Sequence, residues 1–370
     1  MTATVQAPLM PASRNSALPA LRVSFRLLTL VLLVCSGACS RSSVPRETQA
    51  AATFTNPILP AGPDPWVTRK DGFYYLLVTT NDNITIRKTR ALSNAGAAAP
   101  VVVWTPPAVG PNSVNIWAPE LHFRRGKWYI YYTAGSNKAD LSTQRTFVLE
   151  NASADPTQGR WLDRGRLFSP QADFWAIDGT LLRYRGTDYF VWSGHPDAVQ
   201  NRQCLYIARM ADPVTLTGPR VRLSQPELQW ETNGDPDVNE GPEALVSPRG
   251  HVFLTYSASG CWTDDYALGL LALRPGGNPL NPSDWAKSAQ PVFRQSPTNG
   301  VYGPGHNGFF KSPDGRQDWL IYHANAGGSQ GCKELRSPRM QRFRWNSDDT
   351  PNFGEPVSLK TPQRRPAGEH

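Results

Sequence analysis

Residues 125–135 read RGKWYIYYTAG, a charged residue and a glycine followed by a run of bulky residues. Arg-Gly is typical of the tip of a β-hairpin, and the aromatic run after it is typical of a strand. The glycine of this pattern, Gly126, has counterparts in four further copies at Gly72, Gly186, Gly250 and Gly315. Successive glycines are 54, 60, 64 and 65 residues apart. A repeat of that length, with several short strands in each copy, predicts the blades of a propeller.

The composition of the chain agrees with this prediction. Aromatic residues make up 10% of its 370 residues, and 30 glycines and 34 prolines supply many turns between short strands. No long helical periodicity separates the strand-like runs, which argues against alternating strand and helix units. We therefore expect an all-β, five-bladed β-propeller over residues 53–362, with its active site at one end of the central channel.

Residues 1–38 are predicted to be a secretory signal. Three arginines precede the apolar run at 27–34, which is shorter than the roughly 20 residues that span a bilayer. The sequence SGAC that ends at Cys39 is similar to a bacterial lipobox, in which this cysteine would carry a lipid; a mature chain that begins beyond it is the alternative. Export to the periplasm, the cell surface or the medium follows. We expect a flexible linker at 39–52 and a frayed tail at 363–370.

The net charge of the chain is +8, and removing the leader, which holds three arginines and no acid, leaves +5. The basic residues are scattered, so a nucleic-acid-binding surface is not expected. Contact with a membrane is expected only through a lipid on Cys39. We expect a monomer.

Cysteine usage also points to export. Apart from Cys35 and Cys39 in the leader region, the chain has Cys204, Cys261 and Cys332, whose spacing matches no zinc-binding pattern. An oxidising compartment permits one disulfide, which we expect between Cys261 and Cys332, leaving Cys204 as a buried thiol. The other pairings remain open.

A short polar cluster precedes each repeated glycine. The five clusters are GPDPW (62–66), NIWAPE (115–120), AIDGT (176–180), NEGPE (239–243) and GPGHN (303–307). If each lies on the innermost strand of its blade, their acids and histidine meet near the axis: Asp64, Glu120, Asp178, Glu240 and His306. Desolvated carboxylates repel one another, so a purely structural role for the whole set is disfavoured.

Several carboxylates in one pocket with aromatic walls suit glycoside hydrolysis. This reaction needs one carboxylic acid to protonate the leaving oxygen and a second carboxylate to act from the other side. Aromatic faces pack against the C–H groups of sugars. The residues beside the acidic clusters are therefore expected to contact the substrate: Trp66, Trp117, Trp175 and Ile177.

The five clusters, in this order and at these intervals, resemble glycoside hydrolase family 43, whose members are five-bladed β-propellers that act with inversion. The resemblance covers nearly all of the chain after the linker. It implies that Asp64 is the general base, Glu240 the general acid, and Asp178 a third carboxylate that orients the acid and keeps its pKa raised. It also implies that His306, with water, helps to hold a calcium ion, and that Arg339 reaches the sugar and the carboxylates.

Two further glutamates receive supporting roles. Glu120 is expected to contact a substrate hydroxyl at the rim of the channel rather than to transfer a proton. Glu243, three residues after the expected acid, is left with a supporting or structural role.

Residues 256–271 and 301–315 look like the branch of the family that contains secreted exo-acting α-L-arabinofuranosidases. The expected substrates are arabinan, arabinoxylan or arabino-oligosaccharides, and the expected product is terminal arabinofuranose, from α-1,5 linkages. β-Xylosidase and endo-arabinanase activities in the same family remain alternatives, because the catalytic trio does not distinguish them. A non-catalytic glycan-binding propeller is disfavoured because its motifs would repeat almost identically, and a retaining fructan-processing propeller because GPDPW fits it poorly.

Overall fold

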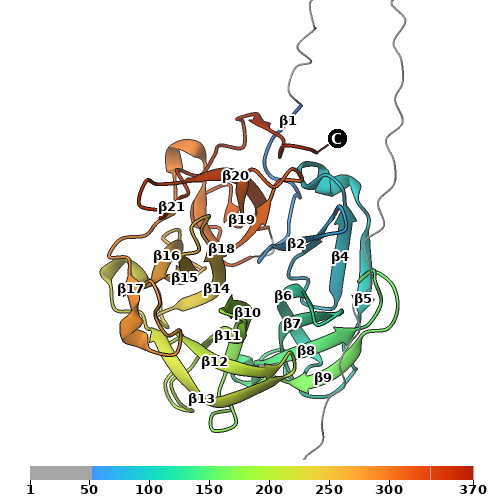
Figure 1. Ribbon diagram of the computed structural model, residues 1–370, viewed down its shortest axis with the longest axis vertical. Coiled ribbons are helices and arrows are strands. Elements are labelled where there is room, and N and C mark those ends of the chain that lie inside the picture. Colours follow the sequence, from blue (N-terminus) through green and yellow to red (C-terminus); the bar gives the residue numbers. More distant parts are fainter. Residues whose placement is uncertain (1–51, 334, 370) are drawn as a thin grey trace, which may run out of the picture. The chain divides into compact units, whose positions relative to one another are not determined.

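The computed structural model describes residues 52–333 and 335–369. Five antiparallel sheets of four strands each surround a central axis (Figure 1). Each sheet is built from four strands that are consecutive in the chain, so each is one blade of a five-bladed propeller. This confirms the predicted fold class. The predictions on the signal sequence and on Cys39 concern residues that lie outside the described part of the chain.

The first strand of each blade is its innermost: β2 (Trp66–Lys70), β6 (Val114–Arg124), β10 (Ala176–Tyr184), β14 (Asn239–Val246) and β18 (Tyr302–Lys311). The second strands are β3 (Phe73–Leu77), β7 (Lys127–Gly135), β11 (Thr187–Gly194), β15 (Val252–Ala258) and β19 (Asp318–Asn325). The third strands are β4 (Ile84–Thr89), β8 (Arg145–Asn151), β12 (Cys204–Asp212), β16 (Ala267–Leu273) and β20 (Ser337–Trp345). The outer strands are β5 (Pro100–Trp104), β9 (Leu162–Arg166), β13 (Thr215–Ser224), β17 (Trp285–Lys287) and β21 (Pro351–Asn352).

The repeated glycines lie in the turns between the first and second strands, as predicted. In the first three blades two consecutive residues with positive φ join these strands: Asp71-Gly72, Arg125-Gly126 and Arg185-Gly186. Positive φ at both central residues defines a type I′ turn, whose twist matches that of the flanking strands. Glycine is favoured at the second position because it has no Cβ to clash there.

Apolar side chains pack between neighbouring blades in five clusters, one at each junction. In β3, Tyr75 and Leu77 face blade 2, whereas Tyr74 and Leu76 face blade 5. Alternate residues of a strand point to opposite faces of its sheet, and here both faces are covered. This explains why the second strand of a blade reads as a continuous bulky run rather than as alternating apolar and polar residues.

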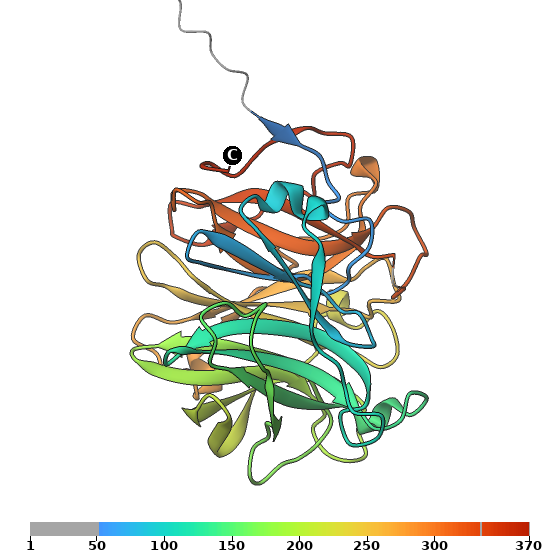
Figure 2. The same ribbon diagram turned by 90° about the vertical axis from the view of Figure 1, so that its right-hand side faces the viewer.

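The two ends of the described chain meet in a separate two-stranded sheet. Strand β1 (Thr53–Phe54) pairs with β22 (Gln363–Arg364) at the edge of the molecule (Figures 1 and 2). Glu369 is 9% exposed, and its carboxylate accepts hydrogen bonds from the backbone N–H groups of Leu92 and Ser93. The expectation of a frayed tail at 363–370 is therefore wrong for residues 363–369, because backbone pairing and this carboxylate hold them in place.

Helical structure in the described residues is limited to short 3₁₀ turns: η1 (Leu92–Ala97), η2 (Leu141–Thr143), η3 (Gln229–Glu231), η4 (Pro282–Asp284) and η5 (Pro297–Asn299). Within this part of the chain, none of them has the length and apolar character that crossing a membrane requires. The turn η2 matters for the site described below, because Leu141 lines its cavity.

Candidate active site

Each inner strand, or the residue pair just before it, contains a residue in the left-handed backbone region at an equivalent position. These residues are Asp64, Ala118, Asp178, Gly241 and His306, with φ between 40° and 56°. In blades 2 to 5 these residues mark bulges, at which strand pairing shifts and a side chain is re-aimed, whereas Asp64 lies just before β2. The equivalent positions in blades 2 and 4 are thus Ala118 and Gly241. The sequence motifs had placed Glu120 and Glu240 at these positions. The structure moves the position by two residues in blade 2, from Glu120 to Ala118, and by one residue in blade 4, from Glu240 to Gly241.

A cavity of about 590 Å³ lies among the inner strands. The three carboxylates expected to act in catalysis line it together, and they are 8%, 5% and 9% exposed for Asp64, Asp178 and Glu240. Four more predicted residues share its wall: Trp117, Trp175, Ile177 and His306. Residues more than 170 positions apart in the chain therefore meet in one hollow, as the repeat predicted.

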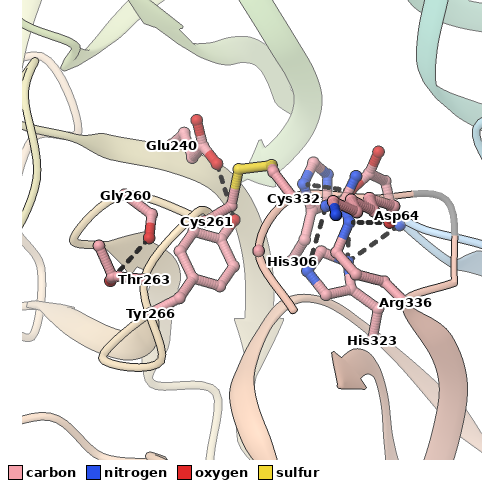
Figure 3. Close-up of a disulfide and its surroundings, with 12 residues drawn as sticks. Asp64, Glu240, Gly260, Cys261, Thr263, Tyr266, His306, His323, Cys332 and Arg336 are labelled. Atoms are coloured by element: carbon pink, nitrogen blue, oxygen red, sulfur yellow. Dashed lines mark hydrogen bonds and ion pairs between the residues drawn. A yellow bond between two sulfur atoms is a disulfide. The ribbon is translucent and has the colours of Figure 1, made fainter. Parts of the chain in front are cut away.

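Asp64 is surrounded by hydrogen-bond donors and positive charge (Figure 3). Arg336 Nη1 lies 3.1 Å from its Oδ1, and the Thr79 hydroxyl donates to its Oδ2 at 2.6 Å. His306 Nδ1 lies 3.3 Å from Oδ1. Burial by itself would raise the pKa of Asp64, but the charge of Arg336, and then that of His306, outweigh it and hold this pKa well below its usual range. Asp64 is therefore a carboxylate throughout the neutral range.

His323 positions the backbone of Asp64. Its Nδ1 accepts the Asp64 backbone N–H at 3.0 Å, and its ring is fully buried. Since a backbone N–H can only donate, Nδ1 is the acceptor in this contact. Burial and the nearby charge of Arg336 lower the pKa of His323 to about 3, so the ring stays neutral.

The surroundings of Glu240 shift its pKa in the direction opposite to that of Asp64. Burial, the largest cause, and the charge of Asp64 raise its pKa to about 7, while a hydrogen bond from Tyr266 and the charge of Arg336 act in the other direction. The Tyr266 hydroxyl donates to Glu240 Oε1 at 2.8 Å (Figure 3). A carboxylic acid with such a pKa keeps a proton to donate near neutral pH.

Asp178 connects the inner strands of blades 3 and 4. Its Oδ2 accepts the backbone N–H of Gly241, the residue after Glu240, at 3.1 Å. Burial first, then the charges of Glu240 and Asp64, raise the pKa of Asp178 well above its usual value. This bond fixes the backbone that carries Glu240.

Aromatic side chains form part of the cavity wall. Trp117 Nε1 donates to Asn81 at 2.8 Å, and Trp175 Nε1 donates to the Leu141 carbonyl at 2.9 Å. The ring of Trp175 stacks on His195, with centroids 4.3 Å apart. A third tryptophan, Trp262, also lines the cavity and is 41% exposed. Trp262 was not predicted from the sequence, although it lies within residues 256–271, which resemble the arabinofuranosidase branch.

Three predicted contact residues do not line this cavity, and their expected roles are corrected. Trp66 belongs to the apolar cluster between blades 1 and 2, with its ring 4.7 Å from that of His122. Glu120 Oε2 lies 2.8 Å from His122 Nε2 rather than at the rim. Arg339 is fully buried in β20 and donates to the Ala324 carbonyl at 3.2 Å. The arginine that reaches the carboxylates is Arg336, three residues earlier.

Glu120 and Glu243 form a second carboxyl pair, away from the cavity lining. They hydrogen-bond to each other and to Thr180, and burial, the largest cause, raises the pKa of both. The supporting or structural role expected of Glu243 stays a prediction. The pair was not predicted, because nothing in the spacing of the two residues shows that their side chains meet.

The calcium ion expected near His306 stays a prediction. Among the described residues, no group of three or more His, Cys, Asp or Glu side chains is arranged to hold a metal. Calcium prefers six to eight oxygen ligands. The ring of His306 lies instead beside Asp64, whose carboxylate Arg336 already engages. The side chains present do not by themselves fit a calcium cage, and no catalytic step is assigned to one.

A disulfide joins Cys261 to Cys332 across a sequence separation of 71, as predicted (Figure 3). Cys204 is a buried free thiol, also as predicted. Both disulfide residues line the cavity beside Trp262, Lys333 and Arg336. The crosslink therefore ties together two loops, from blades 4 and 5, that form one wall of the site.

Comparison with known proteins agrees with this geometry. Residues 54–351 match the model of the family described as "Glycosyl hydrolases family 43". The chain is 40% identical over 349 residues to an extracellular exo-α-(1→5)-L-arabinofuranosidase from Streptomyces avermitilis, covering 91% of this chain and 71% of the relative. It is 36% identical to α-L-arabinofuranosidase 43 of Humicola insolens, covering 90% and 69%. The crystal structure of an α-L-arabinofuranosidase from Lactobacillus brevis superposes with a TM-score of 0.78 at 35% identity, covering 83% of this chain and 98% of that one.

Proposed function

Because the chain belongs to glycosyl hydrolases family 43, we propose that it is an exo-acting α-L-arabinofuranosidase that releases terminal L-arabinofuranose from α-1,5-linked arabinan or arabino-oligosaccharides with inversion. The substrate follows from the relatives, whose names specify this sugar and linkage. The observation that carries the chemistry is the contrast between two carboxyl groups of one cavity, since Asp64 has a lowered pKa and Glu240 a raised one.

This contrast supports a separate role for each carboxyl group. Glu240 donates its proton to the glycosidic oxygen as the bond to the anomeric carbon breaks, so the leaving sugar departs as a neutral alcohol. Asp64 accepts a proton from a water molecule that attacks the anomeric carbon from the opposite face. Asp178 holds the strand that carries Glu240, and the charge of Asp64 helps to keep the proton of Glu240 bound.

The aromatic wall and the disulfide support the remaining parts of the proposal. Trp117, Trp175 and Trp262 offer flat apolar faces for the C–H groups of a sugar. We propose export as well, because the Streptomyces relatives are named as extracellular and a disulfide such as Cys261–Cys332 persists in oxidising compartments.

The test is an assay of the purified protein on linear α-1,5-arabinan and arabino-oligosaccharides, with products sized by chromatography. We expect arabinose as the first and main product, and proton NMR of fresh product should show the configuration opposite to that of the substrate. Glu240→Gln and Asp64→Asn should each lower kcat by about 10³-fold or more while the fold is kept. Mainly xylose from xylo-oligosaccharides, internal cleavage of arabinan, or no turnover with retained binding would each overturn the proposal.

A further inference from the structure

One tyrosine touches groups on both the acid side and the base side of the cavity. The hydroxyl of Tyr266, the residue before β16, donates to Glu240 Oε1 at 2.8 Å. Its ring stacks on His323 with an interplanar angle of 5° and centroids 5.7 Å apart. His323 in turn accepts the backbone N–H of Asp64. The side chain of Tyr266 therefore contacts both Glu240 and a residue that contacts Asp64 (Figure 3).

The surrounding chain is shaped to hold this ring. Tyr266 is 1% exposed. A Cβ at Gly305 would lie 2.2 Å from Cε1 of the ring, so only glycine leaves room for it there. The Ser257 hydroxyl accepts the backbone N–H of His306 at 2.8 Å and lies within hydrogen-bonding reach of the tyrosine hydroxyl. Burial and the charge of Glu240 raise the pKa of Tyr266 well above its usual value, so the hydroxyl keeps its proton and remains a donor.

We propose that Tyr266 is a positioning residue that aims the Glu240 carboxyl for proton donation and, through its stack on His323, fixes the acid relative to Asp64. The inference rests on the proposed role of Glu240 as the general acid. A hydrogen bond to a carboxylate stabilises its ionised form, which is the form that Glu240 takes after it has given up its proton. Tyr266 thus assists the transfer by stabilising its product and by holding one oxygen of the carboxyl still.

Other titratable and charged groups line the cavity together with Glu240. They are Asp64 before β2, Asp178 on β10, His306 on β18, and Lys333 and Arg336 on the loop before β20. Tyr266→Phe leaves all of these in place and keeps the ring that stacks on His323. The change therefore isolates the hydroxyl.

Two measurements on Tyr266→Phe test the inference. The alkaline limb of kcat/KM against pH should move up by about one pH unit, because Glu240 loses a bond that favours its ionised form. On arabinobiose, whose leaving group needs a proton, kcat should fall about tenfold. On a 2,4-dinitrophenyl arabinofuranoside, whose leaving group departs without one, kcat should change by less than about threefold.

The matched control is Tyr256→Phe on β15. Tyr256 is fully buried in the same blade and donates to the carboxylate of Glu231 at 2.9 Å, but neither residue lines the cavity. This variant should lose stability without moving the pH limb or the ratio of rates on the two substrates. If Tyr266→Phe behaves like this control, the inference is overturned while the roles of Glu240 and Asp64 stand. If Glu240→Gln retains activity, the proposed function itself fails.

Discussion

Arg336 Nη1 lies 3.1 Å from Asp64 Oδ1, on a loop that the disulfide at Cys332 anchors. This ion pair is the main reason why a carboxyl group as buried as Asp64 stays ionised. A general base must be ionised to accept a proton, whereas a general acid must not be. The loop before β20 therefore takes part in separating the two proposed roles.

Arg336→Gln should shift the acidic limb of the pH profile upward. Without the guanidinium, burial raises the pKa of Asp64, and the base becomes ionised only at higher pH. We expect a shift of about 1–3 pH units, measured as kcat/KM between pH 3 and 8. The control is Arg316→Gln in the exposed turn of the same blade. If the acidic limb of the pH profile does not move, the prediction is wrong, and the other hydrogen-bond donors are enough to keep Asp64 ionised.

Glu240→Gln should make the protein more stable at alkaline pH. The pKa of Glu240 is raised to about 7 in the folded protein, so the unfolded chain loses this proton at lower pH than the folded one. Glu240 therefore destabilises the folded protein when pH is high. This loss of unfolding free energy is absent below about pH 4, grows as pH rises between the unfolded and folded pKa values of Glu240, and is constant above about pH 7. Thermal unfolding at pH 8 should show a gain of about 1–3 kcal/mol, with little change at pH 4. A loss of stability at pH 8 would contradict this reading.

Removing the disulfide with the double variant Cys261→Ser, Cys332→Ser should lower both stability and activity. Freeing a loop of this length costs about 2–4 kcal/mol of unfolding free energy. The loops that carry Trp262 and Arg336 would also gain freedom, so we expect KM to rise and kcat to fall at a temperature where the variant is still folded. Cys204→Ser is the control, since that thiol is buried outside the cavity. Unchanged kinetics of the folded double variant would show that the crosslink serves stability alone.

Trp175→Ala should weaken substrate binding. Its ring lines the cavity and is held from behind by His195 and by its bond to Leu141. Loss of one aromatic face is worth about 1 kcal/mol, which corresponds to a rise in KM of about five- to tenfold with a smaller effect on kcat. Trp345→Ala on blade 5, whose Nε1 also has a hydrogen-bond acceptor but which lies outside the cavity, should leave KM unchanged.

The architecture was predictable from the sequence because its signal is periodic. Each turn glycine, such as Gly126, and the bulky strand after it recur once per blade, and a buried second strand leaves little room for polar residues. The clusters around Asp64, Asp178 and His306 were equally readable, since each falls at the same distance, within one residue, from a turn glycine and adopts the same left-handed backbone.

The rest of the site was not predictable, because it depends on side-chain direction. Arg336 and Arg339 stand in one motif, but Arg339 lies within β20 and is buried there, whereas Arg336 lies just before the strand and reaches Asp64. A bulge likewise adds one residue to a strand and changes which side chain faces the cavity. This change cannot be found by counting residues from the turn. Tyr266 and His323 look like ordinary core residues in the sequence and acquire their roles only from neighbours more than 20 positions away.

The pairing of Thr53 with Arg364 in the β1–β22 sheet brings the two ends of the described chain together. Every blade is made from one continuous stretch, so none draws strands from both ends. A short bridge joining these ends would make the backbone circular without stretching it. Cutting the circle at an exposed turn such as Arg185-Gly186 would then give a circular permutant in which every carboxyl group of the cavity keeps its place. The order in which the blades are synthesised is thus separable from the chemistry that they enclose.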